Sequence, residues 1–142
     1  MALLVRDALA AVLPGDVVPV TSGNKGMQLY VDTPGLRDPD STRALAQGLA
    51  ETLAAQHPES VTARMTKTLR PGKVFLDWSQ NVAAKTTVCP YSMRGRDDPW
   101  VAAPRTWDEV EEAAATEVDV LRQLTPTQVL DRLDEHGDLM RG

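Results

Sequence analysis

The chain has 142 residues, of which 42% are hydrophobic, and its formal net charge is -5 at pH 7. A chain of this length suits a single domain, 1–142, with a substantial buried core. It holds no apolar run as long as a membrane span, and Arg6 and Asp7 interrupt its N-terminal segment as they would not in a signal peptide. We therefore expect a soluble, intracellular protein without a membrane partner.

The first third of the sequence predicts a helix followed by two strands. Apolar residues recur at helical spacing over 3–13, and Pro14-Gly15 ends the pattern. Two β-rich runs follow at 17–21 and 27–32. They are separated by the turn sequence Ser-Gly-Asn-Lys-Gly, which predicts a tight connection between two strands.

The middle of the chain predicts one long helix and then short strands. Asp40 or Ser41 can cap this helix, the longest expected, and His57-Pro58 stops it. The predicted strands cover 61–65, 74–78 and 85–89. The last of them ends on the sole cysteine, Cys89, which can form no internal disulfide and has no metal-spaced neighbours. We interpret it as a small hydrophobic residue inside the strand.

The last third predicts a loop and two short helices. Beyond Arg96 the sequence is proline-rich and loop-like up to Arg105. Thr106-Trp-Asp-Glu109 has the capping-box pattern, in which the threonine and the glutamate each satisfy a free backbone amide, so an acidic helix is expected there. Thr125-Pro-Thr-Gln128 repeats the pattern, and its helix ends near Gly137. The elements together predict an α/β fold, a mainly antiparallel sheet flanked by helices.

Charge is distributed unevenly along this acidic chain. The segment 62–96 contains seven basic residues and one acid, Asp77. Such a stripe can attract a polyanion, because the local field rather than the total charge steers a phosphate ligand. It can equally be the solvated face of a set of strands, and composition leaves both interpretations open.

The turn at 22–26 combines two glycines with one lysine. Gly23 and Gly26 allow the backbone to approach a ligand closely, and successive amides around Lys25 can form a phosphate-binding concavity. A Walker A loop is excluded, because that motif has more residues between its glycines and leads into a helix, whereas a strand follows here. Glycine and asparagine are also ordinary hairpin residues, so an exposed lysine at a turn is the alternative.

A second candidate site lies at Asp77, where the apolar run 74–76, which suggests a buried strand, ends. Catalytic carboxylates of α/β sheets often project from such strand ends. In a basic segment this carboxylate can balance nearby cations, or it can hold a divalent metal that neutralises a phosphate. Arg94 and Arg96 can clamp phosphate oxygens by forked hydrogen bonds, or they can be surface charges.

Four segments together resemble a known family. They are TSGNKGMQLYV, TARMTKTLRPGKVFLDWSQN, KTTVCPYSMRGR and VAAPRTWDEV. In order and spacing they resemble the second half of the polymerase domain of bacterial DNA ligase D, of actinobacterial type, from about Leu3 to the C-terminus. The resemblance implies the catalytic core of archaeo-eukaryotic primases. It also implies nucleotide addition at DNA ends in non-homologous end joining, in the bacterial cytoplasm and associated with the nucleoid.

The resemblance also implies roles for six residues. Asp77 corresponds to a carboxylate that helps to hold the cation activating the attacking 3'-hydroxyl. The implied contacts to the nucleotide's triphosphate are Ser22, Lys25, Gln28, Gln80 and Arg94. Preplaced cations and donors of this kind stabilise the charge gathered in phosphoryl transfer. The implied cofactor is a divalent metal, Mn²⁺ or Mg²⁺, and the implied partners are a nucleoside triphosphate, DNA ends and end-joining proteins such as Ku and a ligase domain.

Two departures from the family pattern shape the functional expectation. Gln28 stands where many members carry histidine, and an amide can donate a hydrogen bond but cannot take up a proton. The family's paired aspartates lie upstream of the helix with which this chain begins. Asp38-Pro-Asp40 comes too late in the chain to replace them, and we assign it to helix capping. Since one aspartate cannot hold a two-metal site, we expect this chain alone to be catalytically incomplete.

Two other classes of function stay open. The chain can be a non-catalytic module that holds nucleotide or DNA ends through their phosphates, with an affinity that falls as salt rises. It can also be an interaction fragment that docks a partner through the acidic helix at 109–119 and completes a split domain. A metal-dependent primer-extension assay separates catalysis from both alternatives.

Overall fold

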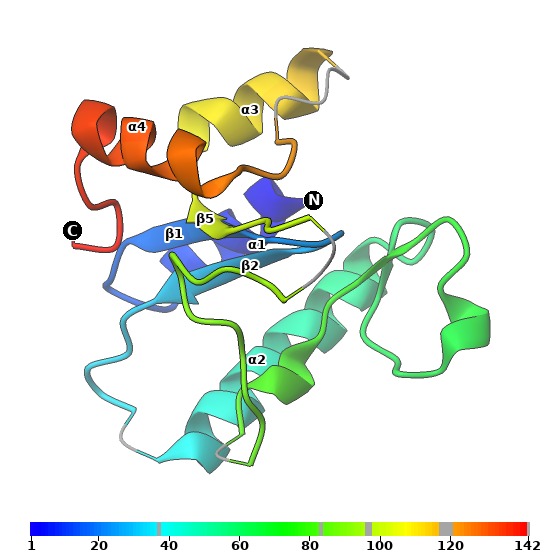
Figure 1. Ribbon diagram of the computed structural model, residues 1–142. Helices are drawn as coiled ribbons and strands as arrows, with labels where there is room; N and C mark the ends of the chain where they lie inside the picture. The colour runs from blue at the N-terminus through cyan, green and yellow to red at the C-terminus, as the bar shows by residue number, and fades with distance from the viewer. Residues whose placement is uncertain (37, 83, 96–97, 117–120, 142) are drawn as a thin grey trace. The chain divides into compact units, whose positions relative to one another are not determined.

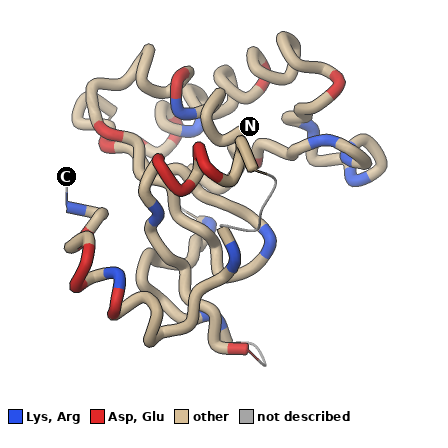
Figure 2. The backbone as a smooth tube through the Cα atoms, turned by 90° about the horizontal axis from the view of Figure 1, so that it is seen from above, with Lys and Arg blue, Asp and Glu red and all other residues tan. Residues whose placement is uncertain are grey.

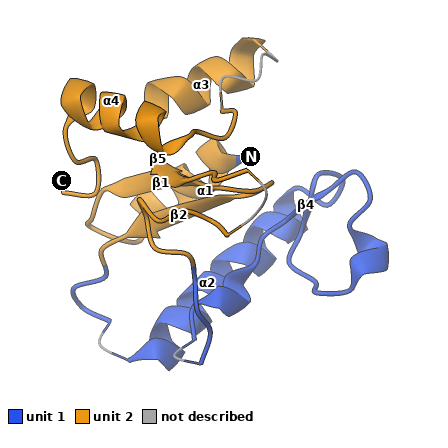
Figure 3. Ribbon diagram, viewed as in Figure 1, with its two compact units in different colours: residues 1, 33–87 blue, residues 2–32, 88–142 orange. Residues whose placement is uncertain are grey.

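The computed structural model describes residues 1–36, 38–82, 84–95, 98–116 and 121–141 (Figure 1). The chain forms two compact units (Figure 3). One consists of residues 2–32 and 88–142 and is called the sheet unit; the other consists of residues 1 and 33–87 and is called the helix unit. In the described ranges, no helix is both long and apolar enough to cross a membrane.

The sheet unit is built on three antiparallel strands (Figure 1). The central strand is β1 (Val17–Ser22), which pairs with β2 (Met27–Val31) along one edge and with β5 (Ala102–Pro104) along the other. Its central position explains why five of the six β1 residues are buried, whereas β2 is half-buried throughout. Opposed pairs include Val17 with Val31, Thr21 with Met27 and Ser22 with Ala102.

The described part of the sheet unit also contains three helices. The helix α1 (Ala2–Ala10) contacts β1 and β2, and it ends before Pro14-Gly15 as predicted. The helices α3 (Trp107–Thr116) and α4 (Pro126–His136) lie on one side of the sheet (Figure 1). A buried cluster ties β5 to the start of α4, and Tyr91 packs against it. The members of the cluster are Val101, Ala103, Leu124 and Val129.

Both predicted capping boxes are present. The Thr106 amide donates to the Glu109 carboxylate at 2.8 Å, and the Glu109 amide donates to the Thr106 hydroxyl at 3.3 Å. Thr125 and Gln128 form the same reciprocal pair at the start of α4, with proline at the first helical position. Gly137 ends α4, as predicted. The predicted end of the acidic helix at 119 lies outside the described residues.

The helix unit is organised around α2 (Pro39–Gln56). Asp38 is its N-cap, because the Asp38 carboxylate accepts a hydrogen bond from the Ser41 amide at 2.8 Å. The predicted cap at Asp40 or Ser41 is therefore wrong by two or three residues, whereas the assignment of the Asp-Pro-Asp sequence to capping is confirmed. His57 is the C-cap, as its position before a proline predicts.

The strands of the helix unit are shorter than predicted. β3 (Val61–Thr62) and β4 (Val74–Phe75) form a two-stranded parallel sheet in place of strands at 61–65 and 74–78. Two 3-10 helices, η1 (Lys67–Leu69) and η2 (Trp78–Gln80), take up residues between and after them. Val74 is 46% exposed, so the prediction of a buried run at 74–76 is wrong.

Two secondary-structure predictions are wrong: the strand at 85–89 and the loop that leads up to Arg105. Residues 85–89, all of which the structure describes, form no strand, and Cys89 is exposed rather than enclosed in one. In contrast, β5 lies in the stretch predicted to be a loop, and its backbone pairs with β1. The 85–89 segment is rich in β-branched residues but finds no partner strand, while Ala102–Pro104 has weak strand propensity and is made a strand by its place in the core.

Candidate functional site

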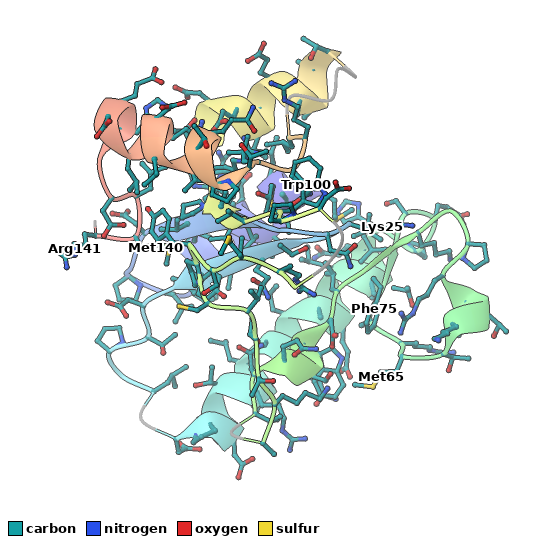
Figure 4. The ribbon with its side chains drawn as sticks, viewed as in Figure 1. Lys25, Met65, Phe75, Trp100, Met140 and Arg141 are labelled. Carbon is teal, nitrogen blue, oxygen red and sulfur yellow. The ribbon has the colours of Figure 1, made fainter. Side chains whose placement is uncertain are left out.

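The turn between β1 and β2 is closed by two hydrogen bonds. The Ser22 amide donates to the Gly26 carbonyl at 2.9 Å, and the Gly26 amide donates to the Ser22 hydroxyl at 3.2 Å. Ser22 is buried at the base of the turn, and Lys25 is exposed within it (Figure 4). The sequence therefore places one cation on a turn whose two ends are fixed by hydrogen bonds.

Arg94 lies against the same turn. Its backbone amide donates to the Trp100 carbonyl at 2.8 Å, and its Nε donates to the Ser22 carbonyl at 2.9 Å. The two terminal nitrogens of the guanidinium have no hydrogen-bond partner among the residues that the structure describes. Arg94 is thus held by one nitrogen and keeps the fork that binds phosphate or carboxylate oxygens.

Gly23 allows Arg94 to lie close to the turn. Its φ is +66°, in the left-handed region that favours glycine. A Cβ at this position would lie 3.1 Å from Arg94 Cγ and 3.2 Å from the Trp100 carbonyl oxygen. Both the backbone conformation and the available space therefore require glycine here.

Gln28 lies on β2 beside Tyr30. The Tyr30 hydroxyl is 3.2 Å from Gln28 Oε1 and 3.2 Å from the Val88 carbonyl, and its single proton can be donated to one of them at a time. Burial raises the pKa of Tyr30, with a smaller contribution from Cys89. The hydroxyl therefore stays protonated at neutral pH, and when it donates to Gln28 Oε1, the amide nitrogen of Gln28 is left to donate to a ligand.

Asp77 is surrounded by donors in the helix unit. Its Oδ1 accepts from the Ser79 amide at 3.2 Å and from the Ser79 hydroxyl at 2.6 Å, while its Oδ2 accepts from Gln80 Nε2 at 2.9 Å. Lys85 Nζ donates to the Ser79 hydroxyl. Because an ammonium group can only donate, the hydroxyl proton is directed to Asp77.

These contacts keep the carboxylate ionised. Burial raises the pKa of Asp77, but the hydrogen bonds from Gln80 and Ser79 and the charge of Lys85 outweigh burial and lower the pKa below its ordinary value. An ionised carboxylate is the form that binds metal. With both lone pairs of Oδ1 occupied by Ser79, Oδ2 is the oxygen that has capacity left for a cation.

Asp77 can serve as a ligand of a cation that takes one carboxylate from the described residues. Within the described ranges, no group of three or more His, Cys, Asp or Glu side chains is arranged to hold a metal ion. Mg²⁺ is usually bound through one or two carboxylates, waters and substrate phosphates, which Asp77 suits. A site for two metals needs more carboxylates than the described residues bring together.

The loop at 64–73 carries the basic residues of the helix unit. The sequence of this loop contains four cations, Arg64, Lys67, Arg70 and Lys73, and no acid (Figure 2 colours Lys and Arg blue). The Arg70 guanidinium donates to the Met65 carbonyl at 2.7 Å and lies 3.8 Å from the centre of the Phe75 ring (Phe75 is labelled in Figure 4). Arg64 and Lys67 are exposed and available to a polyanion. Arg96, which the sequence suggests as a second phosphate clamp, lies outside the described residues.

The predicted site residues fall into two groups (Figure 3). The sheet unit brings Arg94 against the turn of Ser22 and Lys25 and carries Gln28, while the helix unit brings Gln80 to Asp77. Sequence reasoning assigned no role to Ser79 or Lys85. The sequence does contain a signal for Ser79, because a serine two residues after an aspartate can direct both its backbone amide and its hydroxyl to the aspartate carboxylate.

A hairpin turn that carries Lys25 and is contacted by Arg94, together with a donor-capped aspartate on an α/β fold, defines a candidate phosphate-binding protein. Comparison with known families is more specific. The family model described as "LigD, primase-polymerase domain" matches residues 1–140, and the chain belongs to this family.

The relatives agree with this assignment. The chain is 54% identical to the multifunctional non-homologous end joining protein LigD of Mycolicibacterium smegmatis, over 94% of this chain and 17% of that protein. It is 51% identical to the corresponding DNA repair protein LigD of Mycobacterium tuberculosis, over 99% of this chain and 18% of that protein. It therefore spans less than a fifth of the length of these curated relatives.

A solved structure shows the same fold. The polymerase domain of Mycobacterium tuberculosis ligase D, in complex with DNA, matches with a TM-score of 0.89 and 47% identity. The match covers 98% of this chain and 46% of that chain. The predicted α/β fold and the predicted resemblance to the ligase D polymerase domain are thereby confirmed.

Proposed function

We propose that this chain provides the triphosphate-binding part of a nucleotidyl-transfer site that adds nucleotides at DNA ends in non-homologous end joining. Membership of the LigD primase-polymerase family supports the reaction class. The observation that carries the proposal is the bond from Arg94 Nε to the Ser22 carbonyl, which holds the guanidinium against the turn of Lys25 while its two terminal nitrogens bind none of the described residues. Residues 1–142 then belong to one polymerase domain, and DNA ends, Ku and a ligase domain are its partners at the nucleoid.

Each residue has a task that its chemistry permits. Lys25 and Arg94 neutralise phosphate oxygens, with the arginine fork fixing their orientation. The side-chain amides of Gln28 and Gln80 donate further hydrogen bonds to the triphosphate. Asp77 offers Oδ2 to a divalent cation, Mn²⁺ or Mg²⁺, which when bound neutralises phosphate charge and activates the attacking hydroxyl. Ser79 keeps the other oxygen in place.

Binding of ATP or inorganic tripolyphosphate to the 142-residue chain tests this proposal by calorimetry. Lys25→Ala and Arg94→Ala each remove a charge-assisted contact, and each is expected to weaken binding about 10-fold or more. Arg43→Ala is the matched control, because Arg43 is an exposed cation that pairs with Asp40 at 3.9 Å. Unchanged affinity in both the Lys25 and the Arg94 variant would refute the proposal.

A non-catalytic binding role is the second candidate. It is favoured by the single carboxylate at Asp77 and by the absence, among the described residues, of a three-ligand metal cluster. Under this alternative the chain binds DNA ends with an affinity that falls steeply with salt, and it extends no primer with either metal. Metal-dependent extension by the 142-residue chain, lost in Asp77→Asn, would decide for catalysis. Co-purification with a fragment carrying paired aspartates would instead support a split domain.

A further inference from the structure

Tyr91 has an unusual backbone conformation three residues before Arg94. Its φ is +66°, and among the described residues it is the only one other than glycine with a positive φ. For a bulky side chain this conformation is a true outlier, since Cβ crowds the neighbouring carbonyl. Such conformations persist only where the surroundings fix them, and they concentrate at functional sites.

Three contacts hold Tyr91 in place. Its amide donates to the Ala102 carbonyl on β5 at 2.7 Å. Its ring packs against the core cluster that contains Val101 and Val129. Its hydroxyl donates to Asp138 Oδ1 at 2.8 Å. Tyr91 is therefore tied to the sheet by its backbone and to the segment that follows α4 by its side chain.

Asp138 organises that segment into a turn (Met140 and Arg141 are labelled in Figure 4). The Met140 amide donates to Asp138 Oδ1 at 3.0 Å, and the Arg141 amide donates to the Asp138 carbonyl at 3.1 Å. Burial, with the hydrogen bond to Asp138 and the charge of Asp138, raises the pKa of Tyr91 to about 12. The Tyr91 hydroxyl therefore remains a donor throughout the physiological range.

The conformation of Tyr91 sets the path of the chain to Arg94. After Tyr91 the backbone runs beside β5 and the residues before it: the Ala102 amide donates to the Ser92 carbonyl at 2.9 Å, and the Arg94 amide donates to the Trp100 carbonyl at 2.8 Å. A return of Tyr91 to negative φ would redirect the chain and break this pairing. Arg94 Nε would then lose the Ser22 carbonyl that it binds at 2.9 Å.

We propose that the hydrogen bond from Tyr91 to Asp138 is a positioning contact, through which the turn after α4 fixes Arg94 against the turn of Ser22 and Lys25. This inference rests on the proposed function in one respect, that Arg94 binds a triphosphate. The placement of Arg94 itself can be measured without any ligand. Tyr91 and Asp138 touch no substrate and act through Arg94.

The test combines a ligand-free signal with a binding measurement on the full chain. The Arg94 Nε–H resonance in ¹⁵N-edited NMR spectra reports its bond to Ser22, and inorganic tripolyphosphate is the binding probe. Tyr91→Phe removes only the hydroxyl, and Asp138→Ala removes the acceptor. Both are expected to shift the Nε–H resonance, speed its exchange with water, and weaken tripolyphosphate binding about 3- to 10-fold.

Two variants serve as controls. Asp138→Asn keeps an oxygen that accepts from Tyr91, so it is expected to retain the wild-type resonance and affinity. Arg141→Ala removes only the 3.3 Å ion pair with Asp138 and is expected to do the same. A merely structural contact would lower the unfolding temperature and leave both readouts unchanged at a temperature where every variant is folded. Should Asp138→Ala not fold, Tyr91→Phe carries the test.

The outcomes separate the two proposals. An unchanged Arg94 Nε–H resonance in Tyr91→Phe overturns the positioning role, whatever the binding data show. A changed resonance with no tripolyphosphate binding by the wild-type chain supports the positioning contact and overturns the proposed function. A changed resonance with the expected loss of affinity supports both.

Discussion

Glu109 joins two arginines in a largely buried charge cluster at the start of α3, and replacing it by glutamine removes its negative charge and one of its two acceptor oxygens. Its Oε1 accepts from Arg105 at 3.0 Å and from Arg132 at 2.9 Å, and its Oε2 accepts from Arg132 at 2.7 Å and from the Thr106 amide at 2.8 Å. Glutamine fits the same space and still completes the capping box. The substitution therefore leaves the helix start intact but takes from the two arginines one negative charge and one acceptor oxygen.

The expected loss of stability is large because Arg105 is buried and the other two side chains are largely buried. The side chain of Arg105 is 2% exposed, and those of Glu109 and Arg132 are 18% and 19% exposed. Removing one partner of a buried pair leaves an uncompensated charge and costs about 3–5 kcal/mol. This is a large part of the about 5–15 kcal/mol by which domains are usually stable. Glu109→Gln is expected to lower the free energy of unfolding by that amount at neutral pH.

The loss should depend on pH in a defined direction. Burial raises the pKa of Glu109, but the Thr106 amide and the charges of Arg132 and Arg105 outweigh burial and lower the pKa from its ordinary value of 4.5. A lowered pKa in the folded state gives stability that is present above pH 4.5 and is lost as the pH falls through the folded-state value. The difference between wild type and Glu109→Gln should therefore be greatest near neutrality and should shrink in acid.

Urea unfolding followed by tryptophan fluorescence at several pH values measures this difference. Glu111→Gln is the matched control on the same helix, because Glu111 is 52% exposed and, of the residues that the structure describes, binds only Arg6, at 2.8 Å. Its effect is expected to be small, since exposed ion pairs contribute little. A difference below about 1 kcal/mol for Glu109→Gln at pH 7, or one that grows in acid, would show that the cluster does not stabilise the sheet unit in this way.

Three further predictions concern the turn, the carboxylate and the tyrosines. Gly23→Ala is expected to lose about 1–3 kcal/mol in urea unfolding, because φ is +66° and the added Cβ meets backbone at 3.2 Å. Gly72→Ala, at φ +72° but in open space, is expected to lose only about 1 kcal/mol, and equal losses would contradict the role of space. Asp77→Asn keeps the shape of the side chain but is expected to abolish any increase in tripolyphosphate affinity caused by Mn²⁺, measured by calorimetry with and without the metal; a retained increase would exclude Asp77 as a ligand. Alkaline titration of tyrosinate absorbance should show both tyrosines ionising above their ordinary value of 10.0, with the step near 12 missing in Tyr91→Phe. Because a raised tyrosine pKa gives stability that is lost as the pH rises through it, unfolding should accompany that step.

Local chemistry explains which elements the sequence predicts well. The turn after β1, the two capping boxes and the ends of α2 and α4 are determined by residues within four positions of one another, and all are found close to where they were predicted. β5 was missed because alanine and proline carry no strand signal. Ala102 and Ala103 are 0% and 1% exposed because β1 lies beside them, a fact that depends on residues about 80 positions away.

The candidate site likewise combines local contacts, which the sequence can predict, with contacts between residues far apart in the chain, which it cannot. The family resemblance points to Ser22, Lys25 and Arg94 as separate positions, and no spacing rule links Arg94 to a carbonyl 72 residues earlier. The anchoring of Asp77 by Ser79 is local and could have been read from the sequence. Lys85 could not, because its contact depends on a loop that no regular pattern describes.

Two arginines near the turn differ in a way that charge alone does not reveal. Arg105 uses all three of its nitrogens within the protein: Nε donates to the Thr21 hydroxyl, and the terminal nitrogens donate to Glu109 and to the Arg122 carbonyl. Arg94 uses only Nε among the described residues, and no carboxylate of those residues neutralises it. A guanidinium whose donors and charge are both satisfied within the protein has no donor left for a ligand. A guanidinium whose two terminal nitrogens are unpaired can bind an anion through them. The unused donors therefore identify Arg94, and not the more deeply buried Arg105, as the arginine available to a phosphate.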